Sequence, residues 1–381
     1  MKNITLVLPI ATGLLLFGSL LPVTAQTPPS YTIYSLGANT TGLSVSQDGN
    51  YVTGLYYNDG GFSNPEAGFL WTQSGGAVTL PAVGSPDHVD ASPNAVNDSG
   101  VVAGAVSSTT YGAGALPVLY SNSSSATILP LPAASTVGKA YGINNSGTVV
   151  GTIQSAGNWY ATIFGPTDAS VILQTTTDGL ILQYANGIAN TGRIVGQAGN
   201  GSTTAGFYLD SGASNAVNIG SLPNGSSLTE AFGISGNGNY ITGASGANPF
   251  IYQPGTATMT AIPLLANCTS GQGESVNSSG WVVGDSGGET SIPFLYDGTN
   301  TYSLQNLLNG ADSLGWNMTN GTGNAALGIS DNGLITGRAL YDGVNTGFVM
   351  VPTFATPEPS TYALLGIGAF ALVIAYRRKV A

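Results

Sequence analysis

Residues 96–104 read Val-Asn-Asp-Ser-Gly-Val-Val-Ala-Gly, and this phrase decides the fold because the chain contains seven copies of it. Each copy has an apolar residue, a short polar turn that ends in Gly, an apolar pair and a closing Gly. The closing glycines lie 41 to 53 residues apart, a period typical of propellers and solenoids. The other six copies occupy residues 45–54, 143–151, 188–196, 234–243, 276–284 and 329–337.

The chemistry of each phrase predicts a β-hairpin. The Gly that ends the turn can adopt positive φ without steric cost, and a starting Asn or Ser, such as Asn97, can bond the turn backbone. In the five shorter copies the second residue after the turn Gly is always Val or Ile, so one face of that strand is constrained. The closing Gly falls on this face, where we expect another backbone to approach. The copies at 45–54 and 234–243 have one extra residue, which predicts a longer turn.

Two further strands follow each hairpin. The third is rich in aromatic residues, as in residues 68–71, 249–252 and 293–296, and the first six copies add a short fourth strand, as in residues 77–81. Four strands in each of seven repeats predict an all-β fold, a seven-bladed β-propeller. An open β-solenoid is the alternative, but solenoid repeats are usually shorter and need capping units.

The two ends of the repeat array indicate how the ring closes. The seventh copy has three strands and then runs into Val351 and Pro352, whereas an unpaired strand precedes the first copy at residues 31–37. We therefore expect the N-terminal strand to complete the last blade, which would hide the strand edges that an open array exposes. The propeller domain is expected to span residues 26–353.

The N-terminus has the layout of a secretory signal peptide. Lys2 supplies the positive start, residues 4–21 are almost all apolar, and Val23-Thr24-Ala25 fits the small-residue cleavage rule. This predicts a signal peptide at residues 1–25 and a mature chain that starts at Gln26. A first transmembrane helix is the alternative.

The C-terminus, residues 354–381, has the layout of a stop-transfer tail. A Pro-Glu-Pro motif precedes an apolar stretch at residues 362–376, and a basic cluster follows. The stretch is short for a membrane-spanning helix, which needs about 17–25 residues, and the basic cluster would stay on the cytoplasmic side. A single-span anchor that is never cut is one interpretation of this order.

The tail resembles the PEP-CTERM sorting signal of Gram-negative bacteria that make exopolysaccharide. The resemblance implies a C-terminal transmembrane sorting helix that is anchored transiently in the inner membrane and cut by an exosortase. The mature protein would then reach the cell surface or the extracellular matrix of a biofilm. The matching residues are Pro357, Glu358, Pro359, Arg377, Arg378 and Lys379.

The repeats resemble the extracellular HAF-type family. Residues 142–151, 187–196 and 328–337 match its Gly-Ile-Asn…Gly…Val-Val-Gly phrase, but no copy has the family's His before the aromatic strand. The resemblance covers roughly residues 40 to 350 and supports the propeller fold. It implies little about function, because roles in that family are mostly undefined.

Composition excludes several classes of protein. Charged residues make only 7% of the chain, and the net charge is −11 with seven Lys and Arg in all. Outside the two end segments only Lys139, Arg193 and Arg338 are basic, so the exported part should repel nucleic acid and anionic membranes. An acidic polysaccharide would be repelled too, unless cations bridge the two. The single Cys268 excludes an intramolecular disulfide and is interpreted as a small filler.

Few residues carry a pattern typical of catalysis or metal binding. His88 lies between two Asp residues, but with no second His or Cys nearby we favour a solvated loop over a metal site. The turn residues Asp48, Asp98 and Asp331 are explained better by bonding within their own turns than by catalysis. No copy has the alternating oxygen ligands of a calcium loop. We expect no cofactor and no catalytic residue.

Aromatic residues that differ between copies are the better candidates for a ligand site, because sugar rings stack on such faces. The alternative is that they fill contacts between blades. We therefore expect a non-enzymatic surface or exopolysaccharide-matrix protein whose partners are exopolysaccharide or surface proteins. A plainly structural role and a polysaccharide-active enzyme with acids at the propeller mouth are the alternatives. The candidate stacking residues are Trp159, Tyr160, Trp281 and Trp316.

Overall fold

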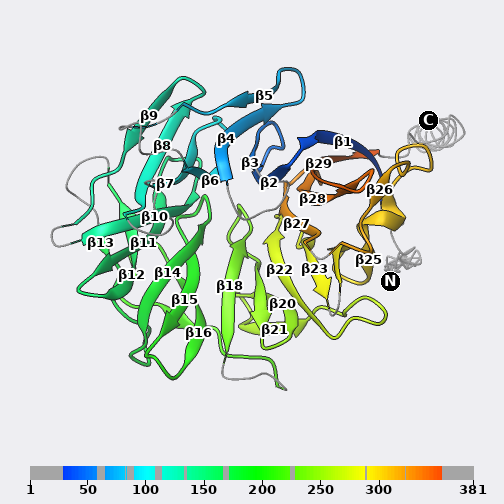
Figure 1. Cartoon of the computed structure of the whole chain (residues 1–381). Coiled ribbons are helices and arrows are strands. Elements are labelled where there is room, and N and C mark those ends of the chain that lie inside the picture. Colours follow the sequence, from blue (N-terminus) through cyan, green and yellow to red (C-terminus); the bar gives the residue numbers. More distant parts are fainter. Residues whose placement is uncertain are drawn as a thin grey trace, which may run out of the picture.

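The chain folds into seven antiparallel sheets arranged as blades around a central axis (Figure 1). The computed structural model describes residues 29–57, 65–81, 83, 90–107, 114–132, 135–165, 171–223, 228–287, 290–321 and 323–353. The prediction of a seven-bladed β-propeller is confirmed. The predicted signal peptide, His88 and the sorting tail lie outside the described residues. Within the described residues, no helix is long and apolar enough to cross a membrane.

The first six blades each contain four strands in chain order, and the first strand of each lies nearest the axis. Blade 1 comprises β2 (Thr40–Val45), β3 (Val52–Tyr57), β4 (Pro65–Thr72) and β5 (Gly76–Thr79). Blade 2 comprises β6 (Asp90–Val96), β7 (Val102–Ser107), β8 (Leu116–Asn122) and β9 (Ser125–Ile128). Blade 3 comprises β10 (Ser135–Ile143), β11 (Val149–Ser155), β12 (Asn158–Phe164) and β13 (Val171–Ile172).

The same order continues around the ring. Blade 4 comprises β14 (Ile181–Ile188), β15 (Ile194–Gly199), β16 (Thr204–Leu209) and β17 (Val217–Asn218). Blade 5 comprises β18 (Thr229–Ile234), β19 (Ile241–Ser245), β20 (Asn248–Gln253) and β21 (Thr258–Ala261). Blade 6 comprises β22 (Ser270–Val276), β23 (Val282–Gly287), β24 (Ser291–Tyr296) and β25 (Thr301–Ser303), after which a short 3-10 helix, η1 (Leu304–Leu307), follows.

The N-terminal strand closes blade 7, as predicted. This blade contains β27 (Ala325–Ile329), β28 (Ile335–Tyr341) and β29 (Val344–Thr353), and β1 (Ser30–Ala38) pairs antiparallel with β29. A short strand, β26 (Trp316–Asn317), also pairs with β28. Tyr31 on β1 is fully buried, and its hydroxyl donates to the Gly333 carbonyl at 3.2 Å. The first and last parts of the propeller are therefore joined in one sheet.

The closing glycine of each repeat is required by the close approach of another backbone, as predicted. The innermost strand of every blade has a β-bulge at this level, and a Cβ on the closing Gly would overlap a backbone carbonyl of that strand. In blade 5, for example, a Cβ on Gly243 would overlap the Glu230 carbonyl oxygen. The turn glycines all have positive φ, between +72° and +84°, as expected for these turns.

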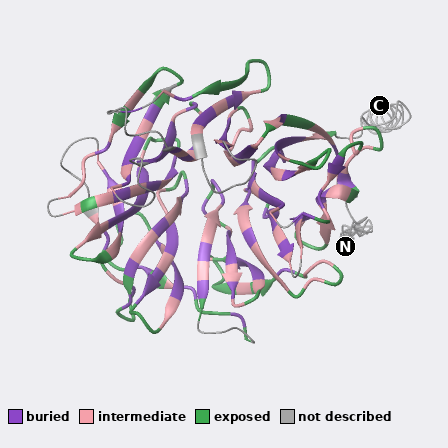
Figure 2. Ribbon diagram, in the orientation of Figure 1, coloured by how far each residue is buried: buried purple, intermediate pink, exposed green. Residues whose placement is uncertain are grey.

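The core lies between neighbouring blades, where buried side chains from two sheets meet. Figure 2 shows buried residues along the strands of the blades. Phe residues of the third strand of a blade are fully buried there, among them Phe69, Phe250 and Phe294. Exposed residues gather in the hairpins at the outer rim (Figure 2). Burial of aromatic rings at each blade contact stabilises the ring without disulfides.

A closed series of hydrogen bonds joins the seven turns between first and second strands. The prediction that the three turn Asp residues bond within their own turns is wrong in two cases. The Asp48 carboxylate accepts a hydrogen bond from Asn50 N–H in its own turn, but Asp98 and Asp331 accept hydrogen bonds from the backbone of the neighbouring turn. The starting Asn residues, such as Asn97, supply the bonds within their own turns. The hydrogen bonds that join neighbouring turns are 2.8–3.1 Å long and link the pairs Asp48–Asp98, Asp98–Asn145, Asn145–Asn190, Asn190–Gly236, Asn237–Ser278, Ser278–Asp331 and Asp331–Gln47.

Candidate functional site

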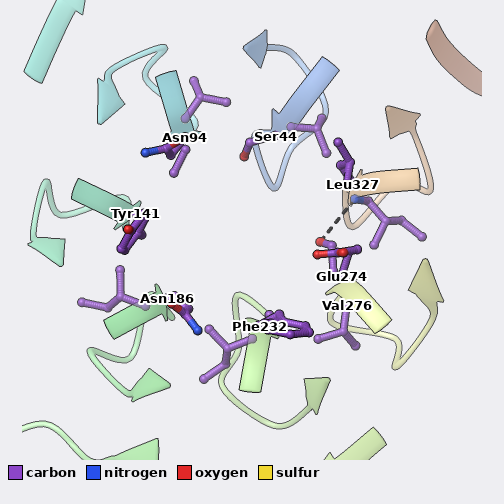
Figure 3. Close-up of a pocket in the computed structure, with 18 of the residues that line it drawn as sticks. Ser44, Asn94, Tyr141, Asn186, Phe232, Glu274, Val276 and Leu327 are labelled. Carbon is purple, nitrogen blue, oxygen red and sulfur yellow. Dashed lines mark hydrogen bonds between the residues drawn. The ribbon is translucent and has the colours of Figure 1, made fainter. Parts of the chain in front are cut away.

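One side chain from each blade lines the central channel, and Figure 3 labels those of blades 2 to 7. Each belongs to the extra residue of the β-bulge, which has no partner in the neighbouring strand and is turned toward the axis. We call this set the bulge ring, and the cavity that it lines, about 180 Å³ in volume, the ring cavity. The bulge ring consists of Leu43, Asn94, Tyr141, Asn186, Phe232, Glu274 and Leu327.

Sequence reasoning did not single out the bulge ring. Each member stands two residues before the apolar residue that begins a phrase, outside the repeated pattern. The residue type at this position varies from Leu to Asn, Tyr, Phe and Glu, so no local motif marks it. A comparison of the copies at this one position could have found it, because the varied position lies among constrained ones.

The two ends of the channel differ. At the end formed by the joined turns, which we call the turn mouth, Gln47 of blade 1 accepts a hydrogen bond from the Asn190 amide of blade 4 at 2.7 Å. A Cβ at Gly236 of blade 5 would overlap the Gln47 side-chain amide, so the glycine leaves the space that Gln47 occupies. Gln47 therefore spans the turn mouth.

The other end, where hairpins join the second and third strands, we call the hairpin mouth. A polar cavity of about 360 Å³ opens there between blades 6 and 7, and we call it the blade 6–7 cavity. Gln272 donates to the Glu274 carboxylate at 2.5 Å, and the Ser291 hydroxyl lies 3.1 Å from the Asp285 carboxylate. Arg338 of blade 7 lines the same cavity and donates to the Gly323 carbonyl at 2.6 Å.

The carboxyl groups of this cavity are held toward the neutral form. Burial, and secondarily the neighbouring Asp285 carboxylate, raise the pKa of Glu274 to about 7. Burial also raises the pKa of Asp285, against the opposing effects of the Ser291 hydroxyl, Arg338 and Gln272. At neutral pH the Glu274 carboxyl can therefore either donate or accept a hydrogen bond.

An aromatic group lies toward the hairpin mouth on blades 3 and 4. The Trp159 ring, beside the β11–β12 hairpin, is partly exposed and lies 5.9 Å from the Tyr184 ring between centroids. Burial, and secondarily Tyr184, raise the pKa of Tyr141 to about 12, so Tyr141 keeps its proton. Figure 3 places Tyr141 across the channel from Glu274.

The four candidate stacking residues do not come together. Tyr160 is partly buried against the core of blades 2 and 3. Trp281 directly follows the turn Gly280 and packs against the core between blades 6 and 7, so it lies at the turn-mouth end, away from Trp159. Trp316 is only 8% exposed and packs against the Tyr341 and Phe348 rings, which leaves its faces little room for a ligand.

The enzyme hypothesis expects two acids from neighbouring blades at one mouth, and the acid pair that the structure brings together does not have this origin. Glu274 and Asp285 interact electrostatically in the blade 6–7 cavity, but both come from blade 6, on the adjacent strands β22 and β23. The turn acids Asp98 and Asp331 are used in joints between blades. Within the described part of the chain, no three His, Cys, Asp or Glu residues form a group that could hold a metal ion.

Comparison with known proteins identifies the C-terminal segment. A model of the PEP-CTERM protein-sorting motif matches residues 355–379, so the chain carries this motif. The motif implies export and exosortase-mediated sorting to the cell surface. No curated protein matches the chain.

Solved structures share the propeller fold at low sequence identity. The chain is similar to an oligogalacturonate lyase in complex with manganese, with 12% identity, a TM-score of 0.51, and coverage of 86% of this chain and 97% of that one. It is also similar to TolB from Acinetobacter baumannii, with 14% identity, a TM-score of 0.45, and coverage of 66% and 62%. A TolB-like protein from Agrobacterium tumefaciens is similar with 11% identity, a TM-score of 0.42, and coverage of 86% of this chain and 98% of that one. At these identities the likeness concerns the fold alone.

Proposed function

We propose that this exported propeller is a non-enzymatic surface or matrix protein that binds a glycan at its hairpin mouth. The observation that carries the proposal is the blade 6–7 cavity, where carboxyl, amide, hydroxyl and guanidinium groups line one hollow. Such a mixed set can donate to and accept from the paired hydroxyls of a sugar. Trp159 and Tyr184 at the same mouth offer aromatic faces for a sugar ring.

The charge of the molecule favours a neutral glycan. Arg338 is the only basic residue that lines the blade 6–7 cavity, among described residues, and it lies beside two carboxyl groups. An anionic polymer would meet a strongly acidic protein and would need cations to bridge the two.

The route to the surface follows from the same proposal. The signal peptide at residues 1–25 would direct export, and the tail would anchor the chain in the inner membrane of a Gram-negative cell until an exosortase cuts it. The repeats would be of the HAF type, a proposal supported by the phrases at residues 142–151, 187–196 and 328–337.

Three variants test the glycan site. Trp159→Ala and Asp285→Asn should each weaken binding of the host's purified exopolysaccharide by about tenfold, because the first removes an aromatic face from the hairpin mouth and the second replaces a carboxyl group there by an amide. Trp281→Ala is the matched control, since its ring lies at the opposite end of the blades. Titration calorimetry measures all three, with circular dichroism to check folding. Equal affinity for all three variants and the parent would place the ligand elsewhere; no binding by the parent would favour the structural role.

A polysaccharide-active enzyme is the second candidate, and one observation favours it. The pKa of Glu274, about 7, would suit a general acid, and Asp285 lies beside it. If this candidate is right, the protein should release reducing ends from the exopolysaccharide, and Glu274→Gln should abolish the release. If the parent protein releases none, the enzymatic candidate fails.

A further inference from the structure

We infer that the glycan site takes the end of a chain rather than an internal segment. This inference rests on the proposed function and adds the direction and depth of binding. It follows from the shape of the channel. The hairpin mouth is open and polar, the ring cavity lies behind it, and Gln47 spans the turn mouth at the far end.

The two cavities are adjacent and share part of their lining. Glu274 and Leu327 line both the blade 6–7 cavity and the ring cavity. A ligand held by Gln272 and Asp285 at the hairpin mouth therefore lies next to Glu274, which is itself a member of the bulge ring. The end of a chain that binds at the mouth can extend inward.

The far end of the hollow prevents a polymer from passing through. Gln47 crosses the turn mouth, where its side chain bonds Asn190 on one side and lies against Gly236 on the other. Its own carbonyl is held by the Asp331 N–H at 2.8 Å, which fixes the base of this bridge. A glycan that enters from the hairpin mouth meets this bridge and must end before it.

An apolar collar lies between the bulge ring and Gln47. It consists of the Val or Ile that begins each phrase, such as Val45, Ile188 and Val276, and these residues also line the ring cavity. Sugar hydroxyls that passed the collar would lose their hydrogen bonds to water and find no polar partners in it. The collar therefore disfavours threading even where Gln47 moves aside.

The chemistry of the bulge ring fits one terminal neutral sugar. The amides of Asn94 and Asn186 donate to carbonyls of the next blade, Ala140 at 2.7 Å and Ala231 at 2.9 Å, so they serve mainly to join blades. Tyr141 and Phe232 present aromatic rings to the hollow, and Glu274 presents a carboxyl group. A sugar ring can stack on the aromatic rings while one of its hydroxyl groups forms a hydrogen bond with the Glu274 carboxyl group.

Stoichiometry tests the inference directly. The probe is the host's purified exopolysaccharide, sheared into short and long fractions and titrated into the full-length protein by calorimetry. Binding of chain ends predicts the same number of protein molecules per polymer chain in both fractions. A number that rises in proportion to chain length would overturn the inference and leave the glycan function intact. If neither fraction binds, the proposed function fails, and this inference fails with it.

A pair of variants at one position tests depth. Leu43 of blade 1 lines the ring cavity but not the blade 6–7 cavity. Leu43→Trp fills the ring cavity and should weaken binding by about tenfold or more, whereas Leu43→Ala, which keeps the space, should bind within about twofold of the parent. Equal affinity for the two variants would contradict entry of the chain end into the ring cavity. If Leu43→Trp fails to fold, the stoichiometry still decides.

Discussion

At the scale of single residues, the closing glycines and the bulge ring both result from the β-bulge in the innermost strand of each blade. The bulge brings a backbone carbonyl of the innermost strand close to the closing Gly of the next strand, so only a residue without Cβ fits there. The same bulge turns one side chain per blade into the channel. The glycine is therefore constant in every repeat, whereas the bulge residue is free to vary with function.

This relation predicts that Gly243→Ala is strongly destabilising. The new Cβ would overlap the Glu230 carbonyl, and the backbone of β18 would have to shift, at a cost of about 1–3 kcal/mol in the free energy of unfolding. Gly255→Ala in the same blade is the control, because a Cβ there meets nothing within 4 Å. Denaturant unfolding measures both, and an equal, small loss in the two variants would contradict the account.

Glu274 predicts a dependence of stability on pH. Its pKa in the fold, about 7, lies above the ordinary value of 4.5, so between these values the folded protein holds a proton that the unfolded chain has lost. Stability should therefore fall by roughly 2–3 kcal/mol as the pH rises from about 4.5 to about 7, and then level off. Glu274→Gln should lose most of this slope, while Asp285, whose pKa is also raised, acts in the same direction in both proteins. Parallel pH profiles for the two proteins would refute the assignment.

At the scale of elements, β1 holds the ring together. It forms the outer strand of blade 7 although it begins the described chain, and Tyr31 anchors it in the core formed with residues such as Phe348 and Met350. This closure could be predicted from the sequence, because an unpaired strand before the first repeat and a missing one after the last are local signals.

Substitutions of two tyrosines on β1, one buried and one exposed, show how much the anchoring of this strand contributes to the free energy of unfolding. Tyr31→Ala removes a fully buried ring and its hydrogen bond to Gly333, and should cost about 3–5 kcal/mol of unfolding free energy. Tyr34→Ala, at a side chain that is 44% exposed, should cost less than about 0.5 kcal/mol. Thermal and denaturant melts measure the pair; similar losses would mean that β1 contributes little to closure.

The candidate site could be predicted only in part. Blade number, turn chemistry and the role of the closing glycines follow from repeated local patterns, which a single sequence displays. The site depends instead on which residues from distant blades face one channel, so Glu274, Asp285 and Arg338 carry no shared motif. Trp159 was singled out by its variation between copies, yet the same criterion also selected Trp316, which is packed in the core.

At the scale of the whole molecule, the propeller is an acidic ring with unlike ends. Joined turns and Gln47 hold one end, and the other presents the polar blade 6–7 cavity and, on blades 3 and 4, partly exposed aromatic rings. Sorting through the PEP-CTERM motif would place the propeller at the cell surface. The account therefore assigns stability to one end of the channel and ligand binding to the other.

The most direct test of the proposed glycan binding is calorimetric titration of the protein with the host's purified exopolysaccharide, with and without calcium. The account predicts saturable binding in both conditions for a neutral polymer, and binding only with calcium for an acidic one. Absence of heat in both conditions would contradict it.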